Sequence, residues 1–322
     1  MIRKILILIS IMHSWGFAYI FLDDSIPMTF NGESLETPFS GGFNRPKIQW
    51  LDWDNDGDSD LFILDASGYL RYLENQGNST SPEIHLITTN FQNLYCGGWF
   101  YFADFNFDTQ IDLMAQNEDN HNNISYYKNV GGSLYFIEIL SSLSGESVSS
   151  SSVMTPTFSD IDNDGDLDFF TGNVIGTVTF YENIGFDTMP EFELITTYWE
   201  EIYIVGPSQQ RHGASAINFI DIDLDDDFDL SWGDYYQQSL YIIINEGTSG
   251  VPNMDNVNII NQFPIDNPII TSGLNMPSFS DIDHDGDKDL FVTVLSGAYG
   301  YQLNNNFYYY SKLDSTYDYI LQ

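Results

Sequence analysis

The sequence predicts an all-β protein folded as a β-propeller of four-stranded antiparallel blades, with about five blades visible along the chain. Three observations predict this fold: an acidic nonapeptide recurs five times, short stretches with alternating apolar residues flank each copy, and no long stretch has a helical period. One four-stranded sheet cannot bury both of its faces, and radial stacking of several such sheets solves this problem. Two β-sandwich domains, a linear solenoid and a fragment of a larger ring are the alternatives.

The N-terminus resembles a secretory signal peptide. Arg3 and Lys4 form a positive start, residues 5–15 are apolar, and residues 16–18 have the small-x-small pattern of a cleavage site. The apolar stretch is short for a membrane span, and an apolar strand or an anchor is the alternative interpretation. We therefore expect a signal peptide over 1–18, a propeller over 19–322, a secreted or cell-surface location, and no membrane insertion after signal removal.

The acidic nonapeptide starts at residues 52, 104, 160, 221 and 281, so its copies are 52 to 61 residues apart. The third copy reads DIDNDGDLD and contains five carboxylates and no base. Carboxylates this close repel one another and resist compaction unless a cation holds them together. About half of the 47 acidic residues fall in the five windows. The negative charge is therefore concentrated into sites rather than spread over a solvated surface.

Each unit supplies further strand-like stretches around its nonapeptide. One precedes it, as in TFSDID, and another follows it, as in LFILD. A turn then leads to a third stretch, such as GTVTFYENIG or, in the last unit, GYQLNNN at 300–306, and to a fourth such as PEIHLIT. Alternation bounded by Gly, Asn and Pro is typical of strands. Residues 27–30 resemble a fourth strand, and we expect them to pair with the last unit and close the ring.

Composition and charge narrow the function. The 322 residues are 43% hydrophobic and 16% aromatic, which is enough for a large core. The net charge of −38 argues against nucleic acid and anionic lipid as partners, because both would be repelled. Cys96 is the single cysteine, so no intrachain disulfide forms, and we expect it to be a small buried residue.

The pattern D-x-D-x-D-G-D-x-D on a tight turn suits calcium, which takes six to eight oxygen ligands. Positions 1, 3 and 5 supply converging carboxylates, glycine at position 6 permits a positive φ, position 7 offers its carbonyl, and position 9 closes the sphere. An EF-hand would need a glutamate at position 12 and flanking helices, but that position is Ile63, Thr171, Trp232 and Val292 in the four more complete units. Magnesium prefers fewer protein ligands, and zinc prefers His or Cys.

Positions 1, 3, 5 and 9 of the four more complete loops are the predicted calcium ligands: Asp52, Asp54, Asp56, Asp60, Asp160, Asp162, Asp164, Asp168, Asp221, Asp223, Asp225, Asp229, Asp281, Asp283, Asp285 and Asp289. The residues at position 7 are expected to face the ion with their carbonyls and the solvent with their side chains: Asp58, Asp166, Asp227 and Asp287.

Two loops depart from the pattern. The loop at 221–229 has Asp226 in place of glycine, and aspartate tolerates a left-handed conformation better than most residues, so we expect a fourth calcium site there. The loop at 104–112 offers Asp104, Asn106, Asp108 and Asp112, with Thr109 in place of glycine and Gln110 at position 7. Its smaller charge predicts weaker binding of calcium or none.

The segment 156–185, P-x-F-x-D-I-D-N-D-G-D-L-D-F-F followed by G-x-V-x-F-Y-E-N-I-G, resembles the FG-GAP/VCBS repeat of integrin-α-type propellers. All five units carry this pattern, the second and fourth in degenerate form. The resemblance implies a propeller whose loops bind calcium. Such propellers often have seven blades, whereas five units are visible here.

The sequence contains none of the common catalytic motifs, such as G-x-S-x-G or H-E-x-x-H. We therefore expect a non-enzymatic binding or adhesion module for a protein or glycan partner. A carbohydrate-active enzyme resembling a polysaccharide lyase or glycosidase is the alternative, and a purely structural propeller segment is a third. Aromatic residues near turns form a sugar-binding platform or fill gaps between blades, the second being favoured: Tyr198, Trp199, Trp232, Tyr235 and Tyr236.

Overall fold

The computed structural model describes residues 28–30, 33–35, 43–142, 144–151, 153–185, 189–203, 214–254, 259–295, 305–312 and 319–322. The chain divides into two units, Met1–Gly42 and Phe43–Gln322. In the first unit, β1 (Met28–Phe30) pairs antiparallel with β2 (Glu33–Leu35). The predicted signal peptide over 1–18 lies outside the described residues.

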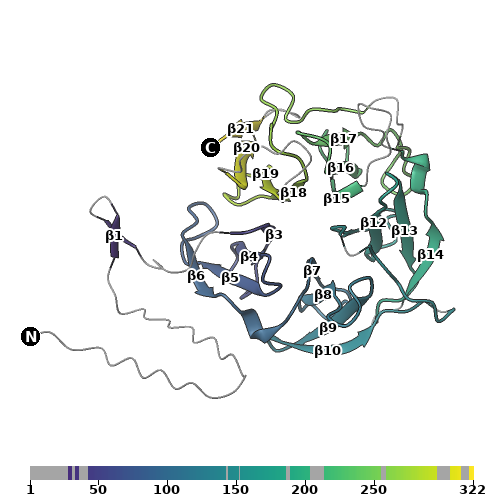
Figure 1. Ribbon diagram of the computed structural model, residues 1–322, viewed down its shortest axis with the longest axis horizontal. Helices are drawn as coiled ribbons and strands as arrows, with labels where there is room; N and C mark the ends of the chain where they lie inside the picture. Colours follow the sequence, from purple (N-terminus) through teal and green to yellow (C-terminus); the bar gives the residue numbers. More distant parts are fainter. Residues whose placement is uncertain are drawn as a thin grey trace, which may run out of the picture. The chain divides into compact units, whose positions relative to one another are not determined.

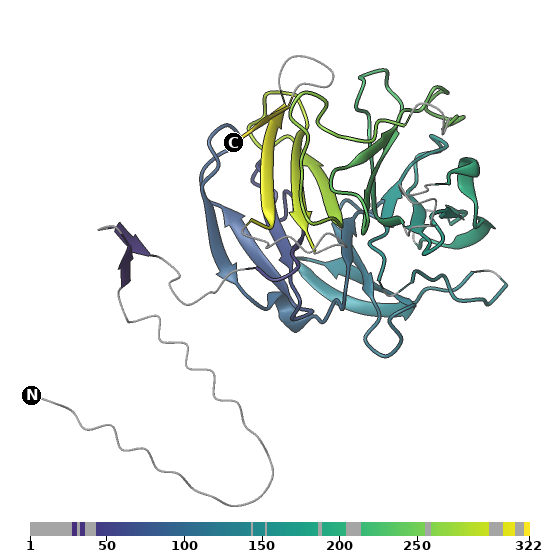
Figure 2. The same cartoon turned by 45° about the horizontal axis from the view of Figure 1, so that its top comes forward.

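The second unit is a five-bladed β-propeller, as the repeat predicts (Figures 1 and 2). Each blade is an antiparallel meander whose strands pair in chain order. The strands of the first three blades are β3 (Lys47–Leu51), β4 (Asp60–Leu64), β5 (Leu70–Asn75), β6 (Ile84–Thr88), β7 (Phe100–Ala103), β8 (Asp112–Gln116), β9 (Ile124–Val130), β10 (Ser133–Ile139), β11 (Thr157–Ser159), β12 (Asp168–Gly172), β13 (Val178–Asn183) and β14 (Phe192–Thr196).

The last two blades comprise β15 (Ala214–Ile220), β16 (Asp229–Asp234), β17 (Tyr241–Ile243), β18 (Asn275–Ser280), β19 (Asp289–Val294), β20 (Phe307–Lys312) and β21 (Tyr319–Leu321). In the fourth blade, an isolated bridge between Ile242 and Ile260 takes the outer position. Two 3₁₀ turns, η1 (Phe91–Asn93) and η2 (Trp199–Glu201), are the only helical elements of the described residues. Within that part of the chain, no helix has the length and apolar character that a membrane crossing requires.

The core lies between neighbouring blades, because the second strand of each blade is apolar on both faces. Phe169 and Phe170 of β12 illustrate this: Phe169 packs in the cluster shared with the second blade, and Phe170 packs in the cluster shared with the fourth. Aromatic pairs cross these interfaces, such as Phe158 with Phe105 at 5.0 Å between ring centroids and Phe170 with Phe219 at 4.7 Å. This two-sided burial explains why consecutive residues of the second strands are apolar, as in Leu61–Leu64 of β4.

The ring closes with five blades, so the alternative of a fragment of a larger ring is wrong. Strand β18 of the fifth blade contacts β3 of the first, and the rings of Trp50 and Phe291 lie 5.0 Å apart. The Asn306 amide also donates to the carbonyl of Phe43 at 2.7 Å.

Closure does not use the N-terminal strand, contrary to expectation. Met28–Phe30 pairs with its own hairpin partner, and β21 supplies the fourth strand of the fifth blade. The third strand of this blade is β20 at Phe307–Lys312, and most of the stretch 300–306 that was expected to form it lies outside the described residues.

Candidate metal-binding loops

The five acidic nonapeptides occupy equivalent places, since each connects the first and second strands of its blade. All blades have the same strand order around the ring, so the five loops lie on the same face of the propeller. The ninth residue of every loop begins the second strand: Asp60, Asp112, Asp168, Asp229 and Asp289.

The backbone of each loop is left-handed at two positions. At position 6, Gly57, Gly165 and Gly286 have φ values of +96°, +101° and +97°, as predicted. Asp226 adopts the same region with φ of +71°, which confirms that aspartate replaces glycine there. Position 4 is also left-handed, for example at Asn163 with φ of +59°, a requirement that the glycine at position 6 does not reveal. Asparagine is a common residue in that conformation.

The carboxylate at position 1 organises the turn by accepting two backbone hydrogen bonds. Asp160 accepts from the N–H groups of Asp164 and Gly165, both at 3.1 Å. Asp52 accepts from Asp56 and Gly57 in the same way, again at 3.1 Å. A charged acceptor for two amides near a left-handed residue holds the loop in a fixed curve.

In four loops this curve brings the carboxylates at positions 1, 3 and 5 together. Within each group, one oxygen from each residue lies within 4.8 Å of the others: Asp52, Asp54 and Asp56; Asp160, Asp162 and Asp164; Asp221, Asp223 and Asp225; Asp281, Asp283 and Asp285. The predicted ligands at position 9 do not belong to these groups.

The side chains at position 7 are buried or half-buried, whereas we expected them to face solvent. Asp58 and Asp227 are 8% and 4% exposed, and Oδ1 of each is buried without a hydrogen-bond partner, as is Oδ1 of Asp166. Burial raises the pKa of Asp166 to about 7, and repulsion from Asp164 adds to this effect. The left-handed residue at position 6 reverses the chain, so the next side chain points back toward the blade. In the fifth loop, Asp287 lies 3.8 Å from the Lys312 ammonium.

The carboxylate at position 9 ties the loop to the third strand of its blade. Oδ1 of Asp168 accepts from the N–H of Asn183 at 2.8 Å, and Oδ1 of Asp229 accepts from the N–H of Asn245 at 2.7 Å. The same bond occurs in the other three blades, to Asn75, Asn129 and Lys312. Asp168 is 1% exposed, its Oδ2 has no partner, and burial raises its pKa to about 8.

The asparagine on the third strand has a second task, which explains the repeated Asn-x-Gly. Oδ1 of Asn183 accepts from the N–H groups of Gly185 and Glu191 at 3.2 and 3.0 Å, and so shapes the next hairpin. A Cβ at Gly185 would lie 2.5 Å from the carbonyl oxygen of Met189, so only glycine fits.

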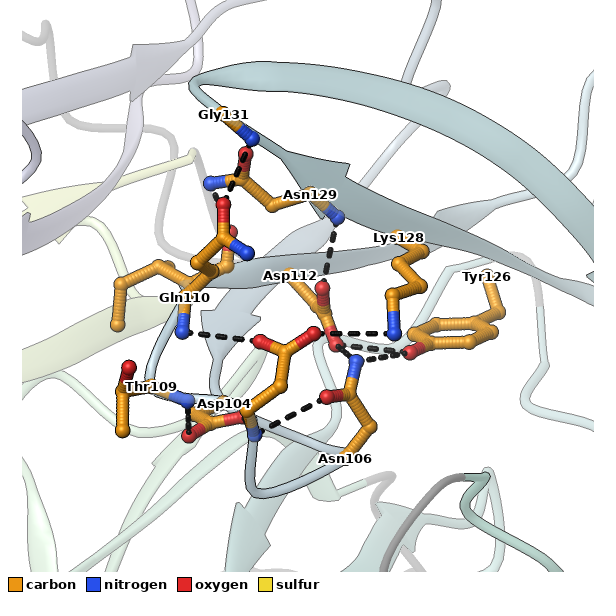
Figure 3. A network of polar contacts seen from close by, with 11 residues as sticks. Asp104, Asn106, Thr109, Gln110, Asp112, Tyr126, Lys128, Asn129 and Gly131 are labelled. Carbon is orange, nitrogen blue, oxygen red and sulfur yellow. Dashed lines mark hydrogen bonds and ion pairs between the residues drawn. The ribbon is translucent and has the colours of Figure 1, made fainter.

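The second loop is completed by nitrogen donors of the protein itself (Figure 3). The Lys128 ammonium lies 3.0 Å from Oδ2 of Asp108, at position 5. The amide nitrogen of Asn106, at position 3, donates to Oδ2 of Asp112 at 2.6 Å and to the Tyr126 hydroxyl at 3.0 Å. Lys128 was not recognised from the sequence. Its position in the repeat could have identified it. Lys128 directly precedes Asn129, and the equivalent residues of the first and third units are Glu74 and Glu182.

A cavity of about 330 Å³ is lined by residues of the inner strands of the ring. Lys47 and Lys288 are among its lining residues, together with Tyr101, and no lining residue is acidic. Burial and the nearby Arg45 lower the pKa of Lys47 to about 8. This cavity thus has the opposite charge character to the acidic loops.

The favoured interpretation, that the aromatic residues near turns fill gaps between blades, is confirmed for two of the five residues. Trp199 and Trp232 are buried in the cluster between the third and fourth blades. Tyr198, Tyr235 and Tyr236 remain exposed, and the rings of the latter two meet edge to face at 5.1 Å. Cys96 is fully buried, as expected.

Fold and loops together define a five-bladed propeller with acidic loops between the first two strands of its blades. The model of the FG-GAP-like repeat matches residues 52–115 and 104–171, which include the first three loops. The chain therefore carries FG-GAP-like repeats over 52–171, in agreement with the resemblance seen in its sequence. No curated protein matches the chain.

Proposed function

We propose that the four acidic loops bind calcium and that the protein is a secreted, non-enzymatic binding module. The observation that carries the calcium proposal is a set of buried carboxylate oxygens without partners. Each of the four loops contains at least one such oxygen, from Asp58, Asp166, Asp168, Asp223, Asp227 and Asp283. A buried carboxylate without a partner is costly, and a cation in the loop would offset that cost.

The donor chemistry fits calcium. The converging groups at positions 1, 3 and 5 are all carboxylates, and the sulfur and imidazole ligands that zinc prefers are absent from these groups. Calcium would supply positive charge that links the loop to the start of the second strand. The chain's part is to hold the carboxylates in place through the amide bonds to position 1 and the bond from position 9 to the third strand.

The binding role is supported by the FG-GAP-like repeats and by the rigid ring that calcium would stabilise. The proposed partner is a protein or a glycan, and the proposed location is outside the cell, on the pattern of residues 1–18. Exposed Tyr235 and Tyr236 provide stacking surfaces of the kind that sugar rings use.

Titration calorimetry with calcium chloride and elemental analysis of the dialysed protein test the calcium proposal. We expect four ions per chain, and a chain that binds none would overturn it. Glycan and protein arrays, probed with and without calcium, test the binding role. Calcium-dependent capture of a partner without chemical change supports it.

A carbohydrate-active enzyme is the second candidate. The observation that favours it is Lys47 in the ring cavity, since an amine with a lowered pKa is a usable base near neutral pH. Incubation with acidic polysaccharides distinguishes the two candidates: unsaturated or reducing-end products that vanish in Lys47→Met support the enzyme, and intact polysaccharide supports the module.

A further inference from the structure

The second loop differs from the other four in the state of its buried polar atoms. Buried carboxylate oxygens without partners occur in the loops of the first, third, fourth and fifth blades. Within the described residues, the loop at 104–112 contains none. It folds the same way, with φ of +57° at Phe107 and +69° at Thr109 and with Asp104 accepting from Asp108 and Thr109. The difference therefore lies in the side chains and not in the backbone.

Two substitutions relative to the acidic loops account for this. At position 3, Oδ1 of both Asp223 and Asp283 lacks a partner, whereas Asn106 has an amide that donates. At position 7, Oδ1 of Asp58, Asp166 and Asp227 lacks a partner, whereas Gln110 carries no charge and its Oε1 accepts from the N–H of Gly131 at 2.7 Å.

At position 5, the carboxylate of the second loop pairs with an ammonium group. Lys128 pairs with Oδ2 of Asp108 at position 5, while Oδ1 of Asp108 accepts from the N–H of Gln110 at 3.0 Å. In the second loop an amide therefore replaces the carboxylate at position 3, and an ammonium pairs with the carboxylate at position 5, which are two of the three positions that converge in the acidic loops (Figure 3).

Lys128 occupies a position in the third strand where two other blades have a glutamate. The residue after it, Asn129, donates its N–H to Asp112, and the same bond fixes Asn75 to Asp60 and Asn183 to Asp168. The residues that correspond to Lys128 are therefore Glu74 and Glu182. One strand position thus presents a carboxylate beside two acidic loops and an ammonium beside the second.

We infer that Lys128, with Asn106, serves as the built-in cation of the second blade, so that this loop closes without metal and is a latent calcium site. This inference rests on the proposed calcium binding for its stoichiometry. Three carboxylates and one ammonium give this site a net charge of −2, whereas the first loop with Glu74 carries −6. The second loop should therefore stay ordered when calcium is removed, and it should accept calcium once its two nitrogen groups are exchanged for carboxylates.

The first test counts calcium ions by titration calorimetry. The wild-type chain should bind four. The variant N106D/K128E, which gives the second loop the carboxylates that the first has at position 3 and at Glu74, should bind five. The reciprocal variant D162N/E182K, which gives the third loop the amide and the ammonium of the second, should bind three. Five ions in the wild type, or four in a folded N106D/K128E, would overturn the inference.

The second test needs no variant and separates this inference from the proposed function. Amide hydrogen exchange is measured on the wild-type chain in EDTA and then in calcium. Amides of 104–112 should keep their protection in EDTA, whereas those of the other four loops should gain at least about tenfold protection on adding calcium. If calcium changes the exchange of no loop, the proposed calcium binding is wrong. If the amides of all five loops exchange equally fast in EDTA, the inference that Lys128 replaces the metal ion is wrong.

Discussion

The carboxylate Oδ1 of Asp168 accepts a hydrogen bond of 2.8 Å from the backbone N–H of Asn183, which lies 15 residues further along the chain. This bond joins the acidic loop to the third strand, and its equivalents recur in all five blades. Position 9 is therefore a structural anchor in the fold, whereas positions 1, 3 and 5 form the converging group that we propose holds a cation. The two kinds of aspartate should respond differently to substitution.

Asp168→Ala should lower the free energy of unfolding even without calcium. The substitution leaves the buried backbone N–H of Asn183 without its acceptor, and a buried donor without a partner costs about 1–3 kcal/mol. Asp164→Ala, at exposed position 5, is the matched control: it should remove one calcium ion and lower the stability of the calcium-free protein less, because the hydrogen bond that it loses, from the N–H of Asp166, is exposed. Urea unfolding in EDTA checks both variants, and equal stability of the two would contradict the anchor role.

Chelation of calcium should lower the melting temperature of the wild-type protein. At about 100 times its dissociation constant, each bound ion adds about 2.7 kcal/mol of stability. Differential scanning calorimetry in calcium and in EDTA measures the shift, with magnesium as the comparison ion. Identical melting curves in all three buffers would argue against metal binding by the folded chain.

Lys47 should make the stability depend on pH in the alkaline range. Its pKa falls from 10.5 to about 8 on folding, so the unfolded chain binds the extra proton between these values. Stability from this group therefore rises as pH increases from about 8 to 10.5. Lys47→Met removes the effect, while the tyrosines titrate in both proteins. The melting temperature of the wild type relative to Lys47→Met should thus be higher at pH 9.5 than at pH 7.5; a constant difference would show that the lysine is not perturbed.

Thr109→Gly should stabilise the protein. Thr109 has φ of +69°, a conformation that costs a residue with a Cβ roughly 1–2 kcal/mol and a β-branched residue more. Gly165→Ala tests the opposite change, since its φ is +101° and no atom lies within 4 Å of the added Cβ, so backbone strain alone should destabilise it. Thermal melts should move in opposite directions for the two variants.

The five blades and the turn at position 6 were predictable because repetition identifies equivalent positions. Gly57, Gly165 and Gly286 mark the sharp turn by residue type alone, and the flanking apolar stretches mark the strands. The orientation of Asp58 and Asp227 was not predictable in this way. It depends on which side of the turn meets the blade, and an alternating run of aspartates contains no information about that.

Contacts between segments that are distant in the sequence were the second feature that could not be predicted from it. Lys128 lies 20 residues from Asp108 and reaches it only because β9 returns beside β8. Closure of the ring was mispredicted for a related reason. Residues 27–30 have the pattern of a fourth strand, but β21 already fills that place in the fifth blade, so the pattern indicated a strand without indicating its neighbour.

The junction between the fifth and first blades has a mechanical consequence. Every other pair of neighbouring blades is joined by the continuing chain, whereas this pair meets through Trp50 on Phe291 and Asn306 on Phe43. Within the described residues, no backbone hydrogen bond crosses this junction. A pulling force applied between Phe43 and Gln322 would therefore load side-chain contacts first, and the propeller should open there and peel away blade by blade rather than rupture as a whole.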